Sequence, residues 1–169
     1  IQESPWVEMT PEERERPGFL GFMTWLGPAE FWGFSEETAA GEAAPSSPGA
    51  TDIGRGWAVS GDGAWEWAGD ALRQTARPTR AIAIGGISGV AGKWRCRVSI
   101  SGGASAGLLF QASRDGREGF AAVLGPDGFR LEALADGRVL WRDSSAAARP
   151  DTLYILEGEV MTDRVAVRL

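Results

Sequence analysis

The chain has 169 residues, 43% of them hydrophobic, and a formal net charge of −6 at pH 7. This length is enough for one domain with a sizeable core, and the acidic balance argues against nucleic acid as a partner. Histidine is absent, which excludes Ser-His-Asp catalysis and metal sites built on imidazole. We expect no cofactor and no metal site. We also expect no membrane-spanning helix, because no apolar run reaches about 18 residues.

Charge divides the chain into two parts. Residues 1–52 hold ten acidic and two basic side chains, a net charge of −8, whereas residues 53–169 carry +2. Such an asymmetry predicts different roles for the two parts. We therefore expect an acidic, aromatic-rich N-terminal arm and linker over 1–52 and a folded body over 53–169.

The arm opens with signals for a short helix. Thr10 is a good N-cap, Pro11 suits the first helical position, and Glu13 follows three residues after the cap. The helix is predicted to run to Arg16, where Pro17 and the glycine after it end it. Residues 35–50 have the Glu, Ala, Pro, Ser and Gly composition of a linker.

Between these segments lies a dense group of apolar side chains, several of them at helical spacing. We predict that they bind a partner protein, because aromatic residues dominate interface hot spots and a tethered segment can order on binding. Two alternatives stay open: the stretch folds back onto its own sandwich, or it lies in a membrane interface. The predicted partner-binding residues are Phe19, Phe22, Met23, Trp25, Leu26, Phe31, Trp32 and Phe34.

The body is predicted to be all-β. Asp-Gly pairs at Asp115, Asp127 and Asp136 separate alternating runs, which favours tight hairpin turns with positive φ at both turn residues. The predicted fold class is an antiparallel β-sandwich of the jelly-roll type with an extended, partly helical N-terminal arm. The predicted strands are 57–60, 64–67, 71–75, 80–84, 93–101, 106–113, 119–124, 129–134, 138–141, 152–160 and 164–169.

Several stretches of the body resemble concanavalin-like, laminin-G-like jelly rolls. They are residues 56–74, residues 105–113, Gly119 with Phe120, and the turn at Asp127 and Gly128. Among such domains, bacterial 3-keto-disaccharide hydrolase-type domains are the nearest, and the similarity covers about residues 56–169. Domains of that kind usually continue beyond a strand such as 163–169, so either the sandwich is open at one edge or its remaining strands lie outside this sequence. At an open edge we expect the arm or a partner strand as cover.

Candidate chemistry in the body is sparse. Glu157 and Glu159 lie two residues apart on one predicted strand, so they share a face roughly 7 Å apart. Paired carboxylates at this separation can hydrolyse glycosidic bonds, although adjacent glutamates on a solvent-facing strand are common. Cys96 falls on the apolar face of its strand and is predicted to be a buried, inert thiol.

Two ligand classes remain to be weighed. Calcium could bind loop carboxylates, but Asp115, Asp127, Asp136 and Asp163 are each explained by their turns. Sugar rings stack on exposed tryptophans, yet Trp at alternating strand positions more often belongs to a core. The tryptophans concerned are Trp57, Trp65, Trp67, Trp94 and Trp141.

The function predicted from the sequence is that of a non-catalytic accessory or scaffolding subunit. Its aromatic arm would dock it onto a larger, membrane-associated bacterial complex, for example a photosynthetic or respiratory one, on the extracytoplasmic side. The alternative, implied by the jelly-roll resemblance, is a carbohydrate-binding or degenerate glycosidase-like domain of an exported protein. The enzymatic variant of that alternative would use Glu157 and Glu159.

Overall fold

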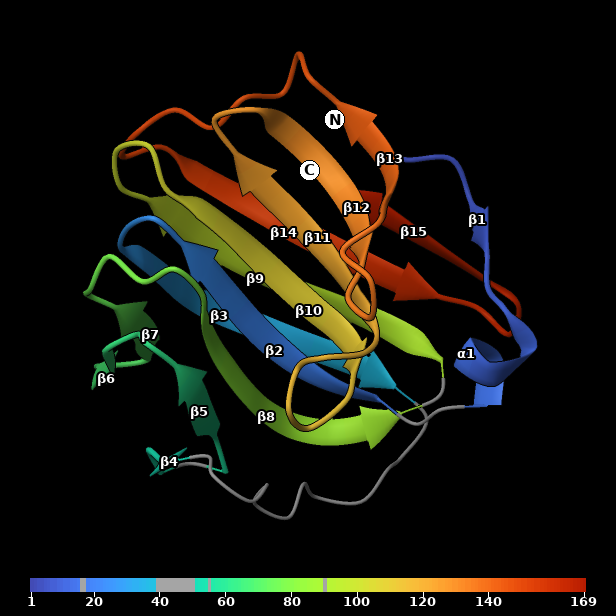
Figure 1. Cartoon of the computed structure of the whole chain (residues 1–169), viewed down its shortest axis with the longest axis horizontal. Coiled ribbons are helices and arrows are strands. Elements are labelled where there is room, and N and C mark those ends of the chain that lie inside the picture. The colour runs from blue at the N-terminus through green and yellow to red at the C-terminus, as the bar shows by residue number, and fades with distance from the viewer. Residues whose placement is uncertain (16–17, 39–50, 55, 90) are drawn as a thin grey trace.

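The computed structural model describes residues 1–15, 18–38, 51–54, 56–89 and 91–169. With 56% of the chain in strands and 4% in helix, the fold is all-β. Two antiparallel sheets stack face to face as a sandwich (Figure 1). The predicted β-sandwich is confirmed. No helix in the described part of the chain is long and apolar enough to cross a membrane.

The two sheets have seven and eight strands. In spatial order, the seven-stranded sheet consists of β1 (Val7–Glu8), β15 (Arg164–Arg168), β14 (Leu153–Val160), β9 (Gly92–Ile100), β3 (Ala29–Thr38), β7 (Ala71–Gln74) and β6 (Trp65–Ala68). The eight-stranded sheet consists of β13 (Val139–Asp143), β12 (Gly128–Ala133), β11 (Phe120–Gly125), β10 (Ser105–Ala112), β2 (Gly18–Trp25), β8 (Ala81–Gly89), β5 (Ala58–Gly61) and β4 (Thr51–Asp52).

The strands of the body lie close to their predicted positions, but the turns between them differ in one respect. Gly116, Gly128 and Gly137 have positive φ, whereas the aspartates before them do not. The prediction of positive φ at both turn residues is therefore wrong. Instead, the aspartate side chain can cap its own turn, as Asp136 does by accepting a hydrogen bond of 3.0 Å from the Arg138 backbone N–H.

The predicted helix start is confirmed. Helix α1 (Pro11–Glu15) is capped by a reciprocal pair of hydrogen bonds. The Thr10 backbone N–H donates to the Glu13 carboxylate (2.7 Å), and the Glu13 backbone N–H donates to the Thr10 hydroxyl (3.4 Å).

The prediction of an aromatic arm outside the sandwich is wrong. Strand β2 pairs with β10 on one side and β8 on the other, and β3 pairs with β9 and β7 (Figure 1). Residues 18–38 therefore supply a central strand to each sheet, and the chain passes from one sheet to the other between Trp25 and Ala29. The linker was predicted over 35–50; this prediction is wrong for residues 35–38, which form the end of β3, and residues 39–50 lie outside the described residues.

The helical spacing in this stretch misleads because β2 is buried on both faces. Leu20 and Phe22 point into the core between the sheets, whereas Phe19 and Met23 belong to a second apolar cluster on the outer face. A strand covered on both sides shows no apolar-polar alternation. Gly21 fits this position, because a Cβ there would lie 2.5 Å from the Ile84 Cδ1 atom.

Aromatic rings from β2 and β3 form the centre of the core. The Phe22 ring stacks on Phe31 with centroids 4.3 Å apart and on Trp57 with centroids 5.1 Å apart. Phe22 and Phe31 have no exposed surface, and Trp57 is 4% exposed. The alternative in which the aromatic stretch folds into its own sandwich is the arrangement observed.

The sheet edge beside β15 is covered by the chain's own N-terminal residues. Strand β1 pairs with β15, and Gln2 exchanges two backbone hydrogen bonds with Leu169 (3.2 and 2.9 Å). The side chain of Arg168 also bonds the Glu3 carboxylate at 2.9 Å. The arm was one of the two segments expected to cover this edge, and its β1 strand does so, which partly satisfies the backbone groups of the edge within the chain.

Candidate functional site

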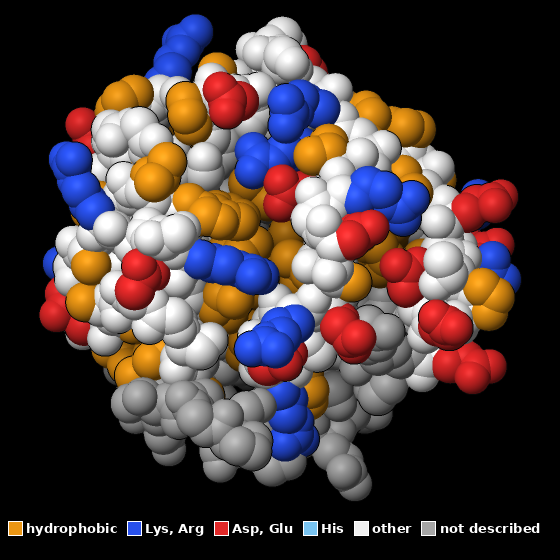
Figure 2. Space-filling model, viewed as in Figure 1, with side chains coloured by type: hydrophobic (Ala, Val, Ile, Leu, Met, Phe, Trp, Pro, Cys, Tyr) orange, Lys and Arg blue, Asp and Glu red, His pale blue; other side chains and the backbone are white. Residues whose placement is uncertain are grey.

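The candidate site is a groove on the outer face of the eight-stranded sheet, with a volume of about 730 Å³. Figure 2 shows this face as a hollow with hydrophobic side chains at its base and charged side chains around its rim. Residues of β2, β10, β12 and β13 line it, together with the segments at residues 79–80 and 134–137. Its size falls within the range of about 300–1,000 Å³ typical of ligand sites.

Two small residues of β10 lie beside Trp25. The Trp25 Cζ3 atom lies 3.7 Å from the position that a Cβ at Gly107 would take, an ordinary contact distance. The adjacent Ser105 pairs directly with Trp25 in the sheet and also lines the groove. Trp25 is therefore a half-buried aromatic side chain with part of its surface open to the hollow.

The opposite wall is polar and comes from β12 and β13. Arg130 and Glu132 lie two residues apart on β12 and form an ion pair. Both side chains are largely buried, with exposed fractions of 14% and 13%. Arg142 of β13 is the direct cross-strand partner of Arg130, and its exposed side chain completes this wall.

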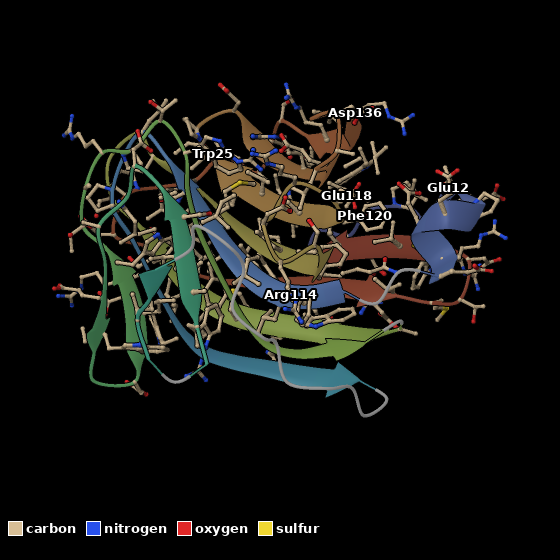
Figure 3. The ribbon with its side chains drawn as sticks, turned by 60° about the horizontal axis from the view of Figure 1, so that its bottom comes forward. Glu12, Trp25, Arg114, Glu118, Phe120 and Asp136 are labelled. Carbon is tan, nitrogen blue, oxygen red and sulfur yellow. The ribbon has the colours of Figure 1, made fainter. Side chains whose placement is uncertain are left out.

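The loop between β10 and β11, residues 113–119, folds back over the same face. The Arg80 guanidinium donates to the Gly116 carbonyl oxygen (3.0 Å) and contacts the Met23 sulfur (3.2 Å), which ties the loop to the sheet. Arg114 of the loop lies 5.2 Å above the Phe19 ring. Figure 3 shows Trp25 and Asp136, two residues that line the groove, on this outer side of the sheet.

The structure separates the predicted partner-binding residues. Four of them are buried within the chain, with exposed fractions of 8% or less, and this burial contradicts the prediction that they contact a partner: Phe19, Phe22, Met23 and Phe31. Trp25 and Leu26 lie at the groove, Leu26 with 68% exposure. Trp32 is half-buried on the outer face of the other sheet, and the Phe34 side chain lies outside what the structure describes.

The tryptophans considered as sugar platforms belong to the core. This is the arrangement that their alternating positions on the strands favoured. Trp94 is fully buried and Trp57 nearly so, and Trp65, Trp67 and Trp141 pack against the same core. Cys96 is also fully buried, and burial strongly raises the pKa of its thiol. The prediction of a buried thiol is confirmed, and the high pKa disfavours the reactive thiolate.

As predicted, Glu157 and Glu159 share a face, on the outer side of the seven-stranded sheet. Both carboxylates form ion pairs with basic side chains. The Arg168 Nη1 atom lies 2.9 Å from Glu157 and 3.0 Å from Glu159, and Lys93 Nζ lies 2.9 Å from Glu157. Partial burial raises the pKa of Glu157, but hydrogen bonds from Lys93 and Arg168 outweigh it and hold this pKa below its ordinary value of 4.5. A general acid for glycoside cleavage needs the opposite shift.

This network should make stability depend on pH. Because the pKa of Glu157 is lower in the folded than in the unfolded chain, its ionised form stabilises the fold above about pH 4.5. That contribution is lost as the pH falls through the folded-state pKa. Between pH 7 and pH 3 we expect the unchanged protein to lose about 1 kcal/mol more stability than Glu157→Gln, as measured by urea unfolding. The exposed Glu12→Gln variant should follow the unchanged protein, and an equal loss in all three would refute this role.

Three of the four aspartates considered for calcium, Asp115, Asp136 and Asp163, serve other contacts. Asp115 accepts hydrogen bonds from the Ser113 hydroxyl (2.7 Å) and the Arg117 backbone N–H (3.1 Å), and the hydroxyl bond is the main cause of its lowered pKa. Asp163 lies 3.9 Å from Arg164. Within the described ranges, no group of three His, Cys, Asp or Glu side chains is placed to hold a metal ion.

Sequence reasoning missed most of the groove. Trp25 was selected, but for contact with a partner, and the polar wall was not selected. A signal for that wall exists in β12, where Phe129 and Leu131 face the core and Arg130 and Glu132 must therefore face outward together. These two opposite charges on one face of β12 therefore mark the outer surface of the sheet. The same surface carries the second apolar cluster and the groove.

Comparison of the chain with family models, with curated proteins and with solved structures finds no match.

Proposed function

We propose that this protein binds carbohydrate in the groove on the outer face of the eight-stranded sheet. The observation that carries the proposal is the half-exposed Trp25 ring in a hollow of about 730 Å³ whose opposite wall holds Arg130, Glu132 and Arg142. A sugar offers an apolar ring face, which stacks on an aromatic ring, and hydroxyl groups, which bond to planar charged side chains.

The shape of the site supports a chain-like ligand. Strands of a sheet lie about 4.8 Å apart, so the four strand spacings from β2 to β13 extend over roughly 19 Å. Trp25 and Arg142 lie at the two ends of this distance, which favours an oligosaccharide over a single sugar. The resemblance of residues 56–169 to concanavalin-like jelly rolls points to the same ligand class and to an exported, extracytoplasmic protein.

Docking onto a larger complex through the aromatic stretch has less support. Such docking needs accessible rings, and the rings of Phe19, Phe22 and Phe31 are covered by the chain itself. Only Trp25, Leu26 and Trp32 retain accessible surface among the predicted residues with described side chains. Two of these three belong to the groove or its rim, where a sugar ligand accounts for them.

The test is binding of the purified protein to an array of plant and bacterial oligosaccharides, followed by calorimetry with the best ligand. Trp25→Ala should weaken binding about tenfold, because the loss of one aromatic stacking contact costs roughly 1.4 kcal/mol. Trp32→Ala is the matched control, since Trp32 is equally half-buried but lies on the other sheet. No binding by the folded protein, or equal weakening in both variants, would contradict the proposal.

A further inference from the structure

Three arginines and three carboxylates line the groove, but among the described residues not every one of these charges has an oppositely charged partner. Arg130 is neutralised by Glu132, to which it is bonded. Arg142 lies directly opposite Arg130, and among the described residues no carboxylate lies within ion-pair distance of it. No carboxylate of the described residues therefore offsets the positive charge of Arg142, which lies on the wall that faces the hollow.

Among the described residues, a second cation in the lining, Arg80, also forms no ion pair with a carboxylate. The Arg80 guanidinium donates to the Gly116 carbonyl oxygen and the Met23 sulfur, both of which are uncharged. On the acidic side, Asp136 is bonded to Arg138, which leaves Asp127 at the β11–β12 turn as the carboxylate without a salt bridge in the described part of the lining. The described part of the lining thus has two cations without a salt bridge, Arg80 and Arg142, and one such carboxylate, Asp127.

The pairing of Arg130 with Arg142 has a further consequence. Arg142 lies opposite the Arg130–Glu132 ion pair, which is neutral overall, so the positive charge that remains on this wall is that of Arg142. An anion that binds beside Arg142 would offset its charge, and guanidinium groups bind carboxylate and sulfate oxygens through paired N–H donors. This wall therefore favours a negatively charged group on the ligand.

We infer that the groove takes an acidic oligosaccharide, with the Arg142 guanidinium as the group that binds the carboxylate or sulfate of the sugar. This inference rests on the proposed function, because it specifies the ligand of the same groove. Stacking on Trp25 would hold one sugar ring, and the acidic group would belong to a residue further along the chain, toward β12 and β13.

The experiment compares matched pairs of oligosaccharides by calorimetry. The pairs are gluco-, galacto- and mannuronate oligosaccharides with their neutral counterparts, and one sulfated oligosaccharide with its unsulfated form. We expect one acidic member to bind about tenfold more tightly than its neutral form, because charge-assisted hydrogen bonds are about twice as strong as neutral ones. Which pair shows the preference distinguishes carboxylate from sulfate.

Two further measurements assign the effect to Arg142. In Arg142→Gln the ratio of acidic to neutral affinity should fall close to one, and raising the salt to about 1 M should reduce it in the unchanged protein. Arg97→Gln is the control, because Arg97 is similarly exposed on the other sheet and should leave both affinities unchanged.

The outcomes separate this inference from the function on which it rests. Equal binding of acidic and neutral members, or a preference that survives Arg142→Gln, would overturn the inference while sugar binding stands. Binding of none of the oligosaccharides by the folded protein would overturn the proposed function, and the inference with it.

Discussion

A chain that lacks residues 1–38 should fail to form a stable sandwich. The deletion removes β2 from between β8 and β10, and β3 from between β7 and β9, so each sheet is split into two parts. It also removes Phe22 and Phe31 from the centre of the core. The loss exceeds the total stability of about 5–15 kcal/mol that a domain of this size has. Circular dichroism and urea titration should show no cooperative unfolding transition.

The control for this deletion removes only residues 1–2. Gln2 contributes two backbone hydrogen bonds at the sheet edge and a side-chain bond to Ser145, and Ile1 is fully exposed. This short deletion should keep a cooperative transition. A cooperative transition with an unchanged midpoint in the chain without residues 1–38 would mean that residues 53–169 form the sandwich alone.

Replacing Phe22 by alanine should lower the free energy of unfolding by about 3–5 kcal/mol, the usual cost of removing a buried phenylalanine ring. Phe22 has no exposed surface, and it stacks on both Phe31 and Trp57. The cavity would therefore open between the two sheets, where neighbouring rings cannot collapse into it. Urea unfolding followed by tryptophan fluorescence measures the change.

Leu26→Ala is the matched control for Phe22→Ala. Both residues belong to the same aromatic stretch, but Leu26 is 68% exposed at the turn between β2 and β3. We expect its replacement to change stability by less than about 0.5 kcal/mol. Similar effects of the two variants would mean that the stretch is not core, and Phe22→Leu should recover much of the loss if ring volume is what matters.

The body strands could be predicted because their signals are local. Alternation in β9 and β12, and the Asp-Gly turns, depend on residues close together in sequence. The placement of β2 and β3 could not be predicted in this way. Their partners, β8 and β10 for one and β7 and β9 for the other, lie far along the chain, and nothing within residues 18–38 identifies them.

The groove was hard to predict for a related reason. Trp25, Arg130 and Arg142 come from three separate strands, and only the order of strands in the sheet brings them to one face. Trp25 was noticed for its ring, but a half-exposed ring at a strand end and a buried one such as Phe31 look alike in sequence. Arg142 became a candidate only when its register placed it opposite Arg130.

The position of β2 and β3 also determines when the protein can fold during synthesis. These strands leave the ribosome before the strands they pair with, so Phe22 faces its partner Leu108, and Phe31 faces Val98, only after β9 and β10 have also been made. Until then two strongly apolar segments remain uncovered, a state that is prone to aggregation and in which chaperones engage nascent chains. Long-range pairing of this kind slows the search for the native arrangement, so assembly is expected to occur late and in one concerted step.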